Sequence, residues 1–124
     1  MHNHLQRAVI ALAQPAAIQL SLFPNFVCKA DELALDFESA LDGLAGHEDK
    51  ITVEQRAAIE ALDQLLTSMS VEEYAYFWTD EAVLADPAWE DIRASAKSTA
   101  LIFGWDLSIV PPSSAVYIPA GNHI

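Results

Sequence analysis

The feature that most constrains the fold is a helical apolar stripe in the middle of the chain. Thr52 is followed three residues later by Gln55. This spacing is typical of a capping box, in which each side chain satisfies a free backbone N–H of the first helical turn. Apolar residues then recur at intervals of three, four and three: Ile59, Leu62, Leu66 and Met69. The pattern predicts a helix from Thr52 to about Met69 with one face buried against partner helices.

Similar signals predict further helices. Asp31 and Glu32 suit the positive end of a helix dipole, and Asp86 followed by Pro87 is a typical helix start. With the central one, the predicted helices are 4–13, 31–46, 52–69, 70–85 and 86–104, with Thr79 as an alternative restart inside the fourth. Their predicted inner faces are Leu5, Val9 and Leu12; Leu33, Phe37, Leu41 and Leu44; and Trp89, Ile92, Ala96 and Phe103.

Two regions depart from the helical pattern. Residues 18–22 alternate between apolar and polar side chains, which favours a strand, with a helix from Ala16 to Leu22 as the alternative. The tail, residues 105–124, holds apolar runs at 107–110 and 115–118, which suit a hairpin, pairing with residues 18–22, or packing on the helices. We therefore predict one mainly α domain over residues 1–124. It is an irregular bundle of four or five helices, to which the chain ends can add a two- or three-stranded sheet.

The charge of the chain is strongly acidic and unevenly distributed. Eighteen acidic residues face six basic ones, and seventeen of the acids lie between Asp31 and Asp91, where only Lys50 and Arg56 are basic. Such a field repels nucleic acid and anionic membranes and attracts basic proteins, although it also serves solubility. No apolar run approaches the roughly 20 residues of a membrane span, and no signal-peptide pattern precedes residue 14. We expect a cytoplasmic protein.

Motifs for chemistry are missing from the sequence. The four glycines are too scattered for a phosphate-binding loop, and three of the four histidines lie near the chain ends. The spacing of histidines and carboxylates matches no metal site, and the single cysteine, Cys28, is expected to be a small buried residue. We therefore expect no catalytic residue, no cofactor and no metal, and a protein that is not an enzyme.

The aromatic segment 74–78 supplies the best candidate surface. At about 100° per residue, Val71, Ala75, Trp78 and Ala82 align toward the core with Tyr74 at their edge, and Tyr76 points away from it. Tyrosine is common in binding hot spots, and surrounding acids would attract a basic partner. The predicted partner-binding residues are Tyr76, Glu72, Glu73 and Asp80.

The predicted function is a non-enzymatic domain whose acidic surface binds a basic protein. In size and charge the chain is similar to bacterial immunity proteins and antitoxins that neutralise basic nuclease toxins, although no motif carries this similarity. One alternative is a structural module or homo-oligomer that associates through the stripe from Ile59 to Met69 or through the apolar tail. A small enzyme or ligand carrier with a pocket between its helices is a further alternative.

Overall fold

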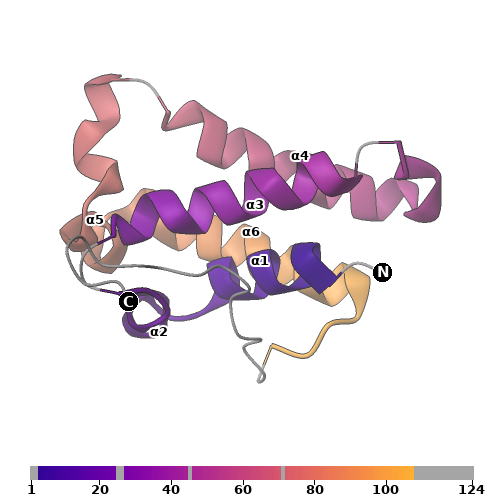
Figure 1. Ribbon diagram of the computed structural model, residues 1–124, viewed down its shortest axis with the longest axis horizontal. Coiled ribbons are helices and arrows are strands. Elements are labelled where there is room, and N and C mark those ends of the chain that lie inside the picture. Colours follow the sequence, from indigo (N-terminus) through magenta and orange to yellow (C-terminus); the bar gives the residue numbers. More distant parts are fainter. Residues whose placement is uncertain (1–2, 25–26, 45, 71, 108–124) are drawn as a thin grey trace, which may run out of the picture.

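A computed structural model describes residues 3–24, 27–44, 46–70 and 72–107, without the side chains of residues 3, 48 and 72–74. These residues form an α-helical bundle with no β-strand among them (Figure 1). The described elements are α1 (Asn3–Ala13), α2 (Ala16–Ser21), α3 (Lys29–Leu44), the 3-10 helix η1 (Glu48–Lys50), α4 (Val53–Ser68), the 3-10 helix η2 (Glu72–Trp78), α5 (Asp80–Ala85) and α6 (Pro87–Phe103).

Helix α6 is the centre of the bundle. It packs mainly on α1 and α4, while α3 packs on α1 and passes in front of α6 in Figure 1. The predicted inner face of α6 is confirmed, because Trp89, Ile92 and Ala96 are fully buried. Helix α1 is buried more completely than a single apolar stripe would require, and Ala8 and Ile10 join its predicted inner face in the core.

The stripe on α4 packs inside the bundle. Ile59, Leu62 and Leu66 are buried in the core, and Met69 packs at its edge. The hydroxyl of Thr99 on α6 donates to the backbone oxygen of Ser95 in its own helix at 2.9 Å, and it lies 3.4 Å from the backbone oxygen of Ala58 on α4, which shows how closely the two helices approach. The apolar face that the 3–4 spacing predicted is therefore buried against another helix of the same chain.

The predicted helix ends agree with the structure at several caps. Thr52 and Gln55 form the full capping box at the start of α4. The Asp86 carboxylate accepts a hydrogen bond from the N–H of Ala88, with Pro87 in the first turn of α6. Gly104 follows α6 with a φ of 76°, a left-handed conformation that costs glycine little.

Residues 16–21 form helix α2, so the prediction of a strand was wrong and its helical alternative was correct. The alternation of polar and apolar residues led to the wrong prediction, because a polar residue of the pattern is buried and an apolar one is exposed. Gln19 is fully buried, whereas Ile18 is 40% exposed. The described residues form six α-helices, whereas the prediction was four or five.

The region 70–85 is divided into η2 and α5, so a continuous α-helix was wrong and the restart at Thr79 was correct. The Thr79 hydroxyl accepts a hydrogen bond from the N–H of Ala82 and caps α5. The Ser70 hydroxyl donates to the backbone oxygen of Leu66, at the end of α4. A 3-10 helix turns about 120° per residue, which redistributes the aromatic side chains of η2.

The first residues of the predicted tail leave the helix and pack on the domain. Trp105 stacks on Phe103 with ring centroids 4.2 Å apart, and the backbone oxygen of Leu107 accepts a hydrogen bond from Gln14. Residues 108–124 lie outside the described residues, and both predicted apolar runs fall largely there. The proposed sheet lacks its first strand, because residues 18–21 are helical.

A buried polar network joins α2 to three other helices. The Gln19 amide nitrogen donates to the backbone oxygens of Ala11 and Leu12, at the end of α1. The Gln19 amide oxygen accepts a bond of 2.9 Å from Arg93 on α6, which also donates to the backbone oxygen of Val83 on α5. Burial lowers the pKa of Arg93, but a guanidinium remains charged in the pH range of proteins. The network therefore satisfies a partly buried charge and two helix-terminal carbonyls together.

The burial of α4 predicts the cost of truncating its inner face. Leu66→Ala should lower the free energy of unfolding by about 2–5 kcal/mol, because it leaves a cavity against α6. Urea unfolding followed by circular dichroism measures this change, with Leu84→Ala on the exposed surface of α5 as the control. An unfolding midpoint equal to that of the natural protein would contradict the packing of α4 on α6.

The Gln19 network predicts a cost for removing its polar contacts even when the size of the side chain is kept. Gln19→Leu replaces the amide by an apolar side chain of similar size and leaves Arg93 and two carbonyls without this partner. It should destabilise the protein by more than about 2 kcal/mol. Gln64→Leu, at an exposed position of α4, is the matched control and should change stability little. Equal unfolding midpoints for the two variants would show that the network contributes nothing.

Candidate functional site

An aromatic cluster fixes the segment that carries the predicted partner-binding residues. Phe77 is buried and stacks on Trp89 of α6, with ring centroids 4.6 Å apart and planes 4° from parallel. The indole N–H of Trp89 donates to the backbone oxygen of Phe77, and that of Trp78 donates to the backbone oxygen of Met69. Both bonds are 2.8 Å long. These contacts hold η2 rigidly against the end of α4 and the start of α6.

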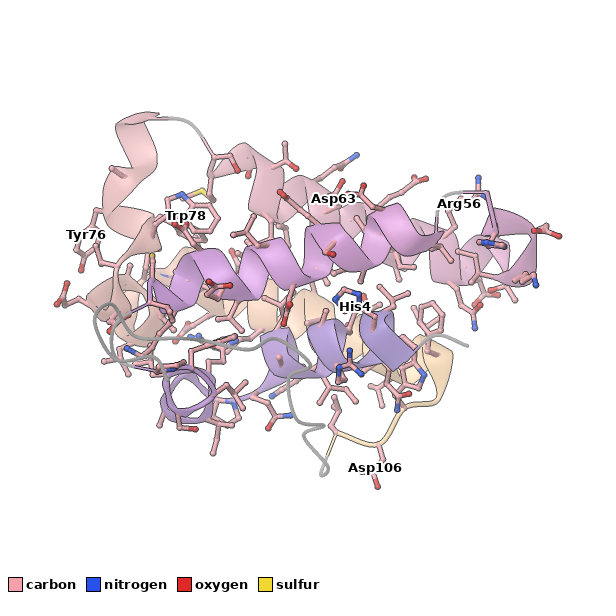
Figure 2. All side chains as sticks on the ribbon, viewed as in Figure 1. His4, Arg56, Asp63, Tyr76, Trp78 and Asp106 are labelled. Atoms are coloured by element: carbon pink, nitrogen blue, oxygen red, sulfur yellow. The ribbon has the colours of Figure 1, made fainter. Side chains whose placement is uncertain are left out.

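The structure redistributes the residues that the sequence assigned to this segment. Tyr76 is 59% exposed and points away from the bundle in Figure 2. Phe77, which the sequence analysis had not selected, is the buried aromatic residue, whereas Ala75 is exposed. The expected inward position of Ala75 was wrong because it assumed α-helical rotation in a segment that forms a 3-10 helix.

Of the three acids predicted around Tyr76, the structure describes the side chain of one. Glu72 and Glu73 belong to η2, but their side chains lie outside the described part of the chain. The Asp80 carboxylate lies 3.3 Å from the ammonium group of Lys29, whose side chain is 8% exposed. Much of the negative charge of Asp80 is therefore matched within the protein. Its role is to pair a buried lysine, which reduces its capacity to attract a basic partner.

A groove lies between α3 and the end of η2, beside the aromatic cluster. It has a volume of about 320 Å³. Its apolar side chains include Leu35, which is 54% exposed, and the partly buried Trp78. Asp31 and Glu38 contribute carboxylates to the same lining. The groove thus combines an accessible apolar surface with negative charge, and its tryptophan is fixed in place.

Three of the groove residues share one face of α3. Asp31, Leu35 and Glu38 are separated by four and three residues, the same spacing that defines the inner stripe of this helix. This second stripe is not evident from the sequence, because two of its three members are acidic and acidic residues on a helix are expected to face solvent. A leucine between two acids on an outward face was the available signal.

Cys28 lies at the start of α3 and is exposed, so its predicted burial was wrong. Its thiol donates to the backbone oxygen of Trp78 at a distance of 3.3 Å, which links α3 to η2. Partial burial raises the pKa of Cys28, and the negative charges of Asp31 and Asp80 raise it further. A thiol in such surroundings is a poor nucleophile at neutral pH, because little of it is ionised.

The described residues offer no group of three or more histidine, cysteine, aspartate or glutamate side chains placed to hold a metal ion. Within the same residues, every helix is too short or too polar to cross a membrane.

The environment of Cys28 predicts slow alkylation. The rate of reaction with iodoacetamide should rise with pH around a midpoint above that of an unperturbed cysteine, about 8.5. Asp31→Asn should shift this midpoint to lower pH, since it removes a negative charge that disfavours the thiolate. Asp36→Asn, five residues further along α3, is the matched control. A midpoint at or below that of a cysteine peptide would contradict the geometry around Cys28.

Comparisons with known proteins provide no relative. No protein-family model matches the chain, and neither does any curated protein or any solved structure. The charges, exposed side chains and cavities of the chain itself are the remaining indication of its function.

Proposed function

We propose that the protein is a non-enzymatic binding domain that holds a basic segment of another protein in the groove between α3 and η2. The observation that supports this most is the composition of the groove. An exposed leucine and a fixed tryptophan lie beside two carboxylates in one concave surface. Protein-binding sites commonly combine such apolar anchors with charged groups that select the partner.

The chemistry of the groove favours an arginine side chain. Asp31 and Glu38 are seven residues apart on α3, about 10 Å along the helix, and Leu35 lies between them. A guanidinium pairs with carboxylates through its N–H groups and stacks on aromatic faces such as that of Trp78. The adjoining Leu35 would contact the apolar stem of the same side chain.

The charge of the chain would assist the encounter. Seventeen acidic residues lie between Asp31 and Asp91, so the part of the chain from α3 to the start of α6 carries a strongly negative charge. The field of such a charge accelerates the association of a basic partner and is weakened by salt. Tyr76 lies two residues before Trp78 in η2 and presents a large exposed ring. We include it in the proposed interface as a further contact.

The proposed activity is like that of immunity proteins and antitoxins, which neutralise basic toxins by covering them. Neutralisation of this kind requires tight binding and a complementary surface, but no catalysed reaction at the interface. The alternative of a homo-oligomer loses one of its two suggested surfaces, because Ile59, Leu62 and Leu66 are buried within the chain. The other suggested surface, the apolar tail, lies mainly outside the described residues.

Affinity capture with variants tests the proposed groove. The immobilised full-length protein is exposed to lysate of the cells that make it, at low and high salt, and bound proteins are identified. We expect a basic protein that is retained at low salt and released at high salt. Glu38→Lys should abolish its retention, and Tyr76→Ala should weaken its binding by over about 1 kcal/mol without unfolding the domain.

The matched control is Glu60→Lys, which makes the same charge change at an exposed position of α4. This variant should retain the basic protein almost as well as the natural chain. Equal losses in both lysine variants would show that only total charge matters and would contradict binding in the groove. Unchanged retention by Glu38→Lys would contradict it as well.

A further inference from the structure

A second cavity lies toward the other end of α3 and has a different character. Its volume is about 300 Å³, and it is enclosed by the first turn of α1, the last turns of α3 and the segment around η1. The apolar part of its lining includes Leu5 and Leu44. Gly43 also lines it, and a Cβ atom added there would meet no other atom within 4 Å. The absence of a side chain at this position therefore leaves the space open.

The polar part of this lining is basic. His4, His47 and Lys50 all contribute to it, although the whole chain has only six lysines and arginines and four histidines. Among the side chains that the structure describes in the lining, none is a carboxylate, despite eighteen acidic residues in the chain. Because acidic residues outnumber basic ones in the chain, a lining of average composition would hold more carboxylates than basic side chains. His4 comes from α1 and the other two from the segment after α3, so the fold brings them together.

We propose that this cavity binds a small organic carboxylate with a short apolar body. The ammonium group of Lys50 and the imidazole N–H groups are donors for the carboxylate. Leu5 and Leu44 cover the apolar part of the ligand. The volume lies at the lower end of the range for small-molecule pockets, about 300–1,000 Å³, which limits the ligand to a few carbon atoms beyond its carboxylate.

Some charges around the cavity favour the binding of an anion and others oppose it. Asp36 Oδ1 lies 3.9 Å from His4 Nε2 and competes with a ligand for this imidazole. Figure 2 shows His4 between α1 and α3, and His4 also lines the cavity. The first turn of α1 presents the positive end of its dipole, and the last turn of α3 presents a negative end. These two backbone contributions oppose each other, so the side chains, above all Lys50, determine the preference for an anion.

Titration with hexanoate tests the site in the full-length protein. Hexanol has the same apolar body without the charge, and inorganic phosphate has charge without the body. Amide NMR should show saturable shifts at Gly43 and Leu44 with hexanoate, and binding several-fold weaker with either of the other probes. Lys50→Gln should weaken hexanoate binding several-fold, whereas the control Lys97→Gln, at an exposed position of α6, should not.

A second variant tests the cavity independently of charge. Gly43→Leu adds a side chain where there is room for one and replaces glycine by a better helix former, so the domain should remain folded. It should reduce hexanoate binding at least about tenfold by occupying the space. Equal affinities for hexanol and hexanoate, equal affinities for phosphate and hexanoate, or unchanged binding by folded Gly43→Leu would each overturn the proposal. The absence of saturable shifts with hexanoate would also overturn it.

Discussion

The arrangement of the helices depends on the buried amide of Gln19. Helix α2 is too short to be stable alone. Its six residues form fewer than two turns, so most of their N–H and C=O groups have no partner within the helix. The amide fastens this turn to the last carbonyls of α1 and, through Arg93, to α6 and α5. Because α5 directly follows η2, the position of α5 also limits where Trp78 can lie against α3. The groove therefore depends on a polar contact at a distance from it.

The longer helices could be predicted because their information is local. A capping residue, an apolar stripe and a terminating glycine lie within a few residues of one another, as at Thr52 and Gly104. The identity of α2 could not be predicted in this way. Its conformation is decided by Gln19, whose partners lie on α1 and α6, and a sequence pattern cannot show that a polar side chain will be buried by such contacts.

The candidate site was predictable only in part for a related reason. The exposure of Tyr76 agrees with the sequence analysis, but the rotation of its neighbours depended on whether η2 would be an α-helix or a 3-10 helix. That choice is made by Phe77 stacking on Trp89, a contact between separate elements. The pairing of Asp80 with Lys29 likewise required knowledge of how α5 meets α3. The charged residues could be counted from the sequence, but the neutralisation of Asp80 by Lys29 within the fold could not be predicted.

The amino end of α3 carries acidic side chains that complement its backbone dipole. Asp31 and Glu32 lie in the first turn, whereas the last turn holds no basic residue, and Lys50 belongs to the segment that follows the helix. At the amino end, Asp31 both stabilises the first turn of α3 and lines the proposed groove. Binding of a basic partner there would therefore not compete with helix stability, as binding does at many sites. A substitution that kept the first turn of α3 stable would tend to keep an acid at this position.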